Sequence, residues 1–269
     1  MNVTHENIAE EYGNAVTGDK KGIVAQTGNA KFAGYSVAEL QLIPEGVAET
    51  SFGCGNPVAF SEVQPGQTVL DLGCGGGLDL ILAAGKVGAT GKVIGVDMTD
   101  EMLALARKNI ARSGFTNIEV KKGKIEALPI DSQSVDWVIS NCVINLSPEK
   151  QTVFSEIARI LKPGGQMLVS DIVAENLPFW VRRSGLLTVA CAGGAISEAE
   201  YLSGLAKAGF ETYRVIAREY YDAAQMASVA TSALPNFLAN RAFTKHLLTR
   251  IAMPISKKLW SARIHAIKA

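Results

Sequence analysis

The feature that most constrains the fold is a regular alternation of short apolar segments and amphipathic segments between residues 68 and 173. Each apolar run is followed by a stretch whose apolar side chains have helical spacing, and this predicts repeated strand–helix units. Units of this kind with short connections predict a parallel sheet with helices on both faces. The chain is therefore expected to be an α/β protein with a doubly wound sheet.

The predicted elements can be placed along the chain. Helix 99–114 has Thr99 as its expected N-cap, acidic residues in its first turn and Gly114 as its stop. The strands are predicted at 67–73, 91–98, 117–123, 134–141, 166–173, 211–221 and 259–269. The helices are predicted at 77–88, 99–114, 147–165 and 197–210, with an alanine-rich helical segment at about 222–257.

No proline-rich or low-complexity linker divides the chain, so we expect one domain. Residues 1–60 are interpreted as an N-terminal helical cap that carries Cys54. Residues 61–175 form the expected core of the fold. Residues 176–269 are expected to supply a loop with Cys191, a helical insertion and the C-terminal completion of the same fold.

Charge and hydropathy narrow the class of protein. Lys and Arg together number 26, as do Asp and Glu, so no net field favours nucleic acid or an anionic membrane. The polar N-terminus does not resemble a signal peptide, and the longest apolar stretch, 185–196, is too short to span a bilayer. We therefore expect a cytoplasmic protein whose four cysteines are thiols.

Glycines follow the first predicted strand, in the segment DLGCGGG at 71–77. Glycines at this point let backbone N–H groups approach a ligand at the carboxyl edge of the sheet. The dinucleotide fingerprint G-x-G-x-x-G starting at Gly73 requires a sixth-position glycine, and that position is Leu78. The spacing is instead G-x-G-x-G, and Cys74 within it is interpreted as a small packing residue.

Two acids indicate what the glycine loop binds. Asp71 stands just before the loop, where its charge would repel a pyrophosphate and attract an ammonium group. Asp97 ends the second strand, where a carboxylate accepts hydrogen bonds from both hydroxyls of a ribose. An adenosine that carries an amino acid fits this pattern better than a dinucleotide.

The ordered set DLGCGGG, GVDM, KIEALP, SVDWVISN and LKPGG resembles the class I methyltransferases that use S-adenosylmethionine, over about residues 65–172. The resemblance implies a class I methyltransferase (Rossmann-like) fold with a mostly parallel sheet. It also implies that the glycines wrap the methionine part of the cofactor and that Asn141 lies beside the sulfonium. The cofactor-binding residues expected on this basis are Asp71, Gly73, Gly75, Gly77, Asp97, Met98, Ile125, Glu126 and Asn141, with Met98 on the adenine and Ile125 and Glu126 at its edge.

Three further cysteines stand in segments of their own: Cys54 in SFGCGNP, Cys142 in NCVINLSPEK and Cys191 in CAGGA. With SDIV, these segments resemble the arsenite methyltransferases over nearly the whole chain. The resemblance implies that the three cysteines bind trivalent arsenic as substrate and are the catalytic residues. It further implies arsenite and methylarsenite as substrates, a thiol reductant of the thioredoxin or glutathione type as partner, and a role in arsenic detoxification.

The chemistry of arsenic gives a reason for three thiolates. Trivalent arsenic is soft, so thiolates are the ligands that it prefers. Three sulfurs would hold it in a pyramid with its lone pair directed toward the sulfonium methyl, and no general base is needed. The three histidines, His5, His246 and His265, all lie outside the core motifs. Glycines beside Cys54 and Cys191 predict loops that close over the site.

Two other functions remain open at this point. A carbon methyltransferase of the quinone or sterol type would share the general motifs, and its activity would survive replacement of all three cysteines by serine. A thiolate protein that binds arsenite without turnover would need the cysteines but would yield no methylated product.

Overall fold

The computed structural model describes residues 4–17, 35–48, 53, 55–177, 194–221, 250, 256 and 258–269. Cys54, Cys191 and nearly all of the predicted helical segment 222–257 lie outside these residues. The predictions that concern them are therefore not addressed by the fold itself.

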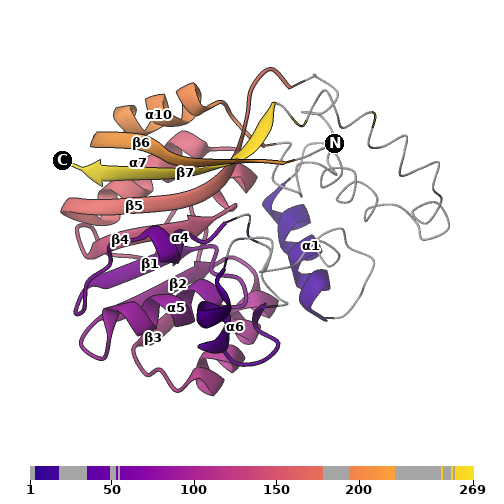
Figure 1. Cartoon of the computed structure of the whole chain (residues 1–269), viewed down its shortest axis with the longest axis vertical. Helices are drawn as coiled ribbons and strands as arrows, with labels where there is room; N and C mark the ends of the chain where they lie inside the picture. Colours follow the sequence, from indigo (N-terminus) through magenta and orange to yellow (C-terminus); the bar gives the residue numbers. More distant parts are fainter. Residues whose placement is uncertain are drawn as a thin grey trace.

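A seven-stranded sheet forms the centre of the molecule, in the order β3-β2-β1-β4-β5-β7-β6 (Figure 1). The first five strands pair in parallel, whereas β7 is antiparallel to both β5 and β6. This confirms the expected doubly wound, mostly parallel sheet. The strands are β1 (Thr68–Leu72), β2 (Lys92–Asp97), β3 (Ile118–Lys122), β4 (Val135–Asn141), β5 (Leu161–Ala174), β6 (Phe210–Tyr220) and β7 (Leu259–Lys268).

Alternate residues of the central strands enter two apolar cores on opposite faces of the sheet. On one face, Val69 of β1 and Trp137 of β4 pack in a cluster with α5 (Leu78–Val87). On the other face, Leu70 packs in a cluster with α7 (Lys150–Ile160) and α10 (Glu198–Lys207). Because both faces are covered, the central strands have the nearly continuous apolar sequences typical of parallel sheets.

The predicted helix 147–165 is shorter in the structure. It begins at Lys150 as α7 and ends at Ile160, and residues 161–165 already belong to β5. Pro163 accounts for the early end, because a residue that precedes proline disfavours the helical conformation. The turn before α7 contains a 3-10 helix, η2 (Ile144–Leu146), which leads away from the end of β4.

One of the N-terminal helices lies on the side where the parallel strands end. Helix α1 (His5–Thr17) lies beyond the carboxyl edge of the sheet and packs against α6 (Asp100–Ser113) (Figure 1). Helix α3 (Val37–Gln41) begins with a capping box, and α4 (Pro57–Phe60) has Asn56 as its N-cap. The expected helical cap is thus present in the described part of residues 1–60.

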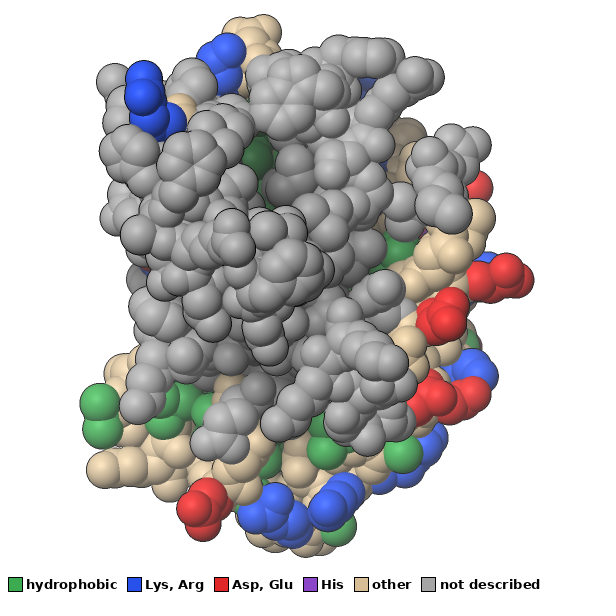
Figure 2. Space-filling model, turned by 90° about the vertical axis from the view of Figure 1, so that its right-hand side faces the viewer, with side chains coloured by type: hydrophobic (Ala, Val, Ile, Leu, Met, Phe, Trp, Pro, Cys, Tyr) green, Lys and Arg blue, Asp and Glu red, His purple; other side chains and the backbone are tan. Residues whose placement is uncertain are grey.

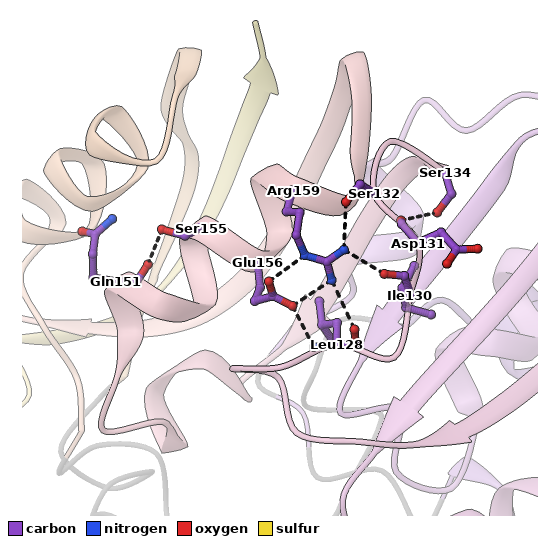
Figure 3. A network of polar contacts seen from close by, with 9 residues as sticks. All are labelled: Leu128, Ile130, Asp131, Ser132, Ser134, Gln151, Ser155, Glu156 and Arg159. Carbon is purple, nitrogen blue, oxygen red and sulfur yellow. Dashed lines mark hydrogen bonds and ion pairs between the residues drawn. The ribbon is translucent and has the colours of Figure 1, made fainter.

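An arginine on α7 fixes the connection between β3 and β4. Arg159 donates hydrogen bonds to the carbonyl oxygens of Leu128 (3.2 Å) and Ile130 (2.9 Å), and it pairs with Glu156 on the same helix (Figure 3). Glu156 in turn accepts a 2.8 Å bond from the Leu128 N–H. These bonds hold the segment that carries the predicted adenine-edge residues against the body of the protein.

Figure 2 views the molecule from the carboxyl edge, and described side chains of both charge signs are visible around the rim of this face. Among the described residues, no helix is long and apolar enough to cross a membrane.

Candidate functional site

A pocket opens at the carboxyl ends of β1, β2 and β4, with about 1000 Å³ of empty space that includes its open mouth. This is the position at which open α/β sheets bind ligands. Both the ends of the strands and helix α1 contribute residues to the wall of this pocket. Of the predicted site residues, the wall contains Asp71, Gly73, Gly75, Asp97, Met98, Ile125, Glu126, Asn141 and Cys142.

The glycine loop turns sharply between β1 and α5. Gly73, Gly75 and Gly77 all have positive φ angles, of 65°, 49° and 86°. A Cβ at Gly73 would collide with the side chain of Val143, so only glycine fits there. Gly77 is the N-cap of α5, where a Cβ would lie 3.5 Å from Ala106, and it does not line the pocket. Gly77 therefore permits the start of α5 to pack closely against Ala106 of α6.

Asp97 faces the glycine loop from the end of β2. Its Oδ2 accepts a 3.0 Å hydrogen bond from the Gly75 N–H, and its Oδ1 accepts a 2.9 Å bond from the Thr99 N–H. Burial raises the pKa of this carboxyl, and the backbone hydrogen bonds offset part of that effect. Each carboxylate oxygen keeps a lone pair for a further donor, so Asp97 can accept two more hydrogen bonds from a ligand.

Two further buried carboxyls flank the loop, and one of them was not predicted. Burial, together with neighbouring Asp79 and Asp97, holds the pKa of Asp71 well above its ordinary value. Asp79, in the first turn of α5, also lines the pocket, and burial raises its pKa to about 6. The pocket thus gathers carboxyl groups in a low-dielectric site, and a cation bound there would favour their ionised form and be attracted by it.

Asn141, at the end of β4, connects this acidic wall to the segment that follows Cys54. Its Oδ1 accepts a 3.0 Å bond from the Gly55 N–H, and its Nδ2 donates to the Gly55 carbonyl at 2.5 Å. The same Nδ2 lies 3.2 Å from the Tyr35 hydroxyl and 3.5 Å from Asp79 Oδ2. Tyr35 was not among the predicted site residues.

Glu126 is held at the opposite wall by two elements. His5 Nε2 of α1 lies 2.9 Å from Glu126 Oε1, and the Ser147 hydroxyl donates to the same oxygen. Burial raises the pKa of Glu126, but the bonds from Ser147 and His5 outweigh burial and leave it lowered, so the group is a carboxylate. The expectation that the histidines lie outside the core motifs holds for the sequence, but the fold brings His5 into the pocket wall.

Cys142 lies directly after β4, as predicted, and is buried in the pocket wall. Its φ angle is 63°, which is unusual for a residue other than glycine and marks local strain of the kind found at functional sites. Its N–H donates a 2.8 Å bond to the Ser170 carbonyl of β5. Cys142 is disulfide-bonded in the structure, so the expectation that all four cysteines are thiols is wrong for this residue.

Cys74 differs from Cys142 in its surroundings. It is a buried free thiol whose sulfur packs against Gly95. Burial, with Asp97 and Asp71 nearby, raises its pKa well above the ordinary value, so it remains a protonated thiol. This agrees with the interpretation of Cys74 as a packing residue.

The other two cysteines lie outside the described residues, but residues near them in sequence are described. Gly53 and Gly55 flank Cys54, and a Cβ at either would collide, with Asn141 and with Ser170 respectively. A Cβ at Gly194, three positions after Cys191, would collide with the Asn145 carbonyl. These glycines permit close packing around the end of β4, which is a different reason from the loop mobility expected from the sequence.

Comparison with known proteins gives consistent matches. A family model described as a methyltransferase domain matches residues 64–209. The chain is 44% identical over 188 residues to an arsenite methyltransferase of Halobacterium salinarum, an alignment that covers 69% of this chain and 48% of that protein. It is 34% identical over 249 residues to an arsenite methyltransferase of Aquipseudomonas alcaligenes, covering 89% of this chain and 69% of the relative.

A solved structure also matches. An arsenic(III) S-adenosylmethionine methyltransferase from Chlamydomonas reinhardtii aligns with a TM-score of 0.69 at 34% sequence identity, covering 86% of this chain and 72% of that one. The chain spans about half the length of the Halobacterium relative. The chain belongs to the arsenite methyltransferase family of S-adenosylmethionine-dependent methyltransferases.

Proposed function

We propose that the chain transfers a methyl group from S-adenosylmethionine to trivalent arsenic bound by cysteine thiolates. The observation that carries this proposal is the position of Cys142. It is buried in the wall of the same pocket that holds the glycine loop and the acidic cluster. A thiolate there would present arsenic directly to a cofactor bound in that pocket.

The residues of the pocket fit the proposed cofactor. The cofactor carries positive charge on its ammonium and sulfonium groups, and the pocket supplies the buried carboxyls of Asp71 and Asp79 and the half-buried carboxyl of Asp97. The lone pairs that Asp97 keeps free suit the two ribose hydroxyls. We assign cofactor binding to Asp71, Gly73, Gly75, Asp97, Met98, Ile125, Glu126 and Asn141, and we add Asp79 to this set; Gly77 acts indirectly through the start of α5.

When bound, the cofactor supplies an electrophilic methyl group on a sulfonium. The residues of the chain itself bind and orient the second substrate, trivalent arsenic. Thiolates of Cys54, Cys142 and Cys191 would replace the hydroxides of arsenite, because trivalent arsenic prefers sulfur ligands. The arsenic lone pair would then bond to the methyl carbon as the carbon–sulfonium bond breaks, and S-adenosylhomocysteine would leave with the electron pair of that bond. Arsenic would thereby be oxidised formally from the trivalent to the pentavalent state, and two electrons from the thiol reductant would return it to the trivalent state. Such positioning can lower a barrier by about 7–11 kcal/mol when the geometry is correct.

The described neighbours of the other two cysteines support their convergence on Cys142. Gly53 and Gly55 pack against Asn141 and Ser170, and Gly194 packs against the Asn145 carbonyl, all close in sequence to Cys142 or to its hydrogen-bond partner. Ala195 shares a buried cluster with Cys142. Both flanking segments therefore run near the end of β4.

We further infer that a thiol reductant is a partner, because the disulfide at Cys142 must be reduced before that sulfur can bind arsenic. A reductant of the thioredoxin or glutathione type supplies two electrons and two protons for this step. Activity should therefore depend on added thiol reductant, and a wild-type protein assayed without one should show little turnover.

Product speciation tests the proposal. The protein is incubated with arsenite, S-adenosylmethionine and a thiol reductant, and the arsenic species are then separated. Methylated arsenic is expected. Arsenite binding without any methylated product would support a non-catalytic binding protein. Methylation of a quinone or sterol by a variant in which Cys54, Cys142 and Cys191 are all serine would support a carbon methyltransferase.

Single variants separate the roles of the thiolates. Methylarsenite has two exchangeable positions where arsenite has three, so it needs only two thiolates. We expect Cys142→Ser and Cys191→Ser to abolish methylation of both substrates. Cys54→Ser should lose methylation of arsenite and retain methylation of methylarsenite. Loss of both reactions in Cys54→Ser, with cofactor binding intact, would contradict this division.

A further inference from the structure

Tyr35 occupies an unusual position between the pocket and the segment around Cys54. The side chain is buried, and its hydroxyl donates a 2.7 Å hydrogen bond to Asp79 Oδ1. The hydroxyl oxygen also accepts a 3.2 Å bond from Asn141 Nδ2. Tyr35 itself does not line the pocket, whereas Asp79 and Asn141 both do.

The hydrogen on this hydroxyl gives the contact a direction. Burial and the neighbouring Asp79 raise the pKa of Tyr35 well above its ordinary value, so the group keeps its proton. The proton is donated to Asp79, and the oxygen can then only accept from Asn141. This fixes which end of the Asn141 amide faces Tyr35, because an amide flipped by 180° would place its carbonyl oxygen against an oxygen lone pair.

The fixed amide determines the backbone next to Cys54. Asn141 accepts from the Gly55 N–H and donates to the Gly55 carbonyl, so one side chain satisfies both polar groups of that residue. If the amide were flipped, its NH2 group would face the Gly55 N–H and its oxygen would face the Gly55 carbonyl, so both hydrogen bonds would be lost. Gly53 also packs so closely on the Asn141 side chain that a Cβ at this position would collide with the amide.

A second set of hydrogen bonds holds the next residue, Asn56. Glu39 accepts two 3.1 Å hydrogen bonds from Asn56 Nδ2, and the same carboxylate completes the capping box with Ser36. Burial raises the pKa of Glu39, but the bonds from Ser36 and Asn56 outweigh it and leave it lowered. Residues 35–41 therefore support the Gly55–Asn56 segment at two points.

We propose that Tyr35 is a positioning residue that couples ligand binding in the pocket to the placement of the backbone around Cys54. A cation bound beside Asp79 favours the ionised carboxylate, which strengthens the bond donated by Tyr35. That bond orients Asn141, and Asn141 holds Gly55. The importance of this coupling for catalysis rests on the proposed function, in which Cys54 is an arsenic ligand.

The test measures Cys54 reactivity without arsenic. Fully reduced protein is alkylated with iodoacetamide, and the rate at Cys54 is followed by peptide mass spectrometry with and without saturating S-adenosylhomocysteine. In the wild type we expect this ligand to change the rate by about fivefold or more, the lower end of typical couplings between sites. In Tyr35→Phe, which removes only the hydroxyl, the ligand should leave the rate nearly unchanged. Tyr213→Phe, on the exposed side of β6, is the matched control and should behave as the wild type.

Each variant is assayed at a ligand concentration that saturates it, set from its own Kd. Asn141→Asp is a second, isosteric variant that keeps the bond accepted from Gly55 and loses the bonds donated to Gly55 and Tyr35; it should also lose the coupling. Retention of the wild-type response in Tyr35→Phe or Asn141→Asp overturns the proposal, and so does a wild type without any response. A wild type that responds but forms no methylated arsenic would instead contradict the proposed function.

Discussion

Replacement of Asp97 by alanine is the most direct test of the cofactor site. The carboxylate bridges the Gly75 and Thr99 N–H groups and keeps one lone pair on each oxygen for the ligand. A hydrogen bond to a charged group contributes about 1.5–3 kcal/mol. Loss of even one such bond to the ligand should weaken binding by about tenfold to a hundredfold. Asp97→Ala also removes the hydrogen bond from the Gly75 N–H, and a less firmly held glycine loop should weaken binding further.

The assay is calorimetric titration of each variant with S-adenosylhomocysteine. Asp100→Ala is the matched control, because Asp100 is an exposed acid nearby that pairs with Lys122 at the surface. It should bind the ligand as the wild type does. A dissociation constant for Asp97→Ala within about twofold of the wild type, in a protein with unchanged circular dichroism, would refute the placement of the ribose at Asp97.

Three further outcomes are expected. His5→Ala should weaken S-adenosylhomocysteine binding severalfold by freeing the Glu126 carboxylate, and His5→Gln, which keeps a donor near the Nε2 position, should restore it; equal affinities would contradict this role. Gly55→Ala should destabilise the protein because its Cβ collides with Ser170, and thermal unfolding of the single variant and of Gly55→Ala/Ser170→Gly should show partial rescue. Burial raises the pKa of Asp171 to about 7 from 3.8, so the folded state binds this proton more tightly than the unfolded state, and its contribution to stability is lost as pH rises through that interval. Urea unfolding of Asp171→Asn should therefore show a gain over the wild type at pH 8 relative to pH 5, of at most about 2.6 kcal/mol, because only about two pKa units of the shift fall between these pH values; the same difference at both pH values would contradict this sign.

The sequence predicted the sheet well because local patterns control it. The apolar runs and helical spacings depend on residues close together in the chain, and Gly114 ends α6 with a φ angle of 79°, as expected for a glycine stop. Helix α7 was predicted too long at its C-terminal end because Pro163 acts on the residue before it.

The parts of the site that sequence reasoning missed depend on contacts between distant residues. His5 and Glu126 are separated by 121 positions, and Tyr35 and Asn141 by 106. No local sequence pattern predicts a contact between residues so far apart in the chain. Asp79 did carry a signal, since it is an acid flanked by leucines at the start of a mostly apolar helix that follows the glycine loop directly. A buried acid at that position would have been a reasonable candidate for a ligand contact.

The site must satisfy two opposing electrostatic requirements. A cationic cofactor is favoured by the acidic cluster around Asp71, whereas thiolates are disfavoured by burial and by the same charges, both of which raise the pKa of the Cys74 thiol. Asn141 resolves this conflict by its place in the chain. It is neutral, it contacts Asp79 on one side, and it directly precedes Cys142 and clamps Gly55 on the other. In the proposed function, an aspartate there would bring another negative charge to the sulfur of Cys142, so the neutral amide separates the acidic wall from that sulfur, and both line one pocket.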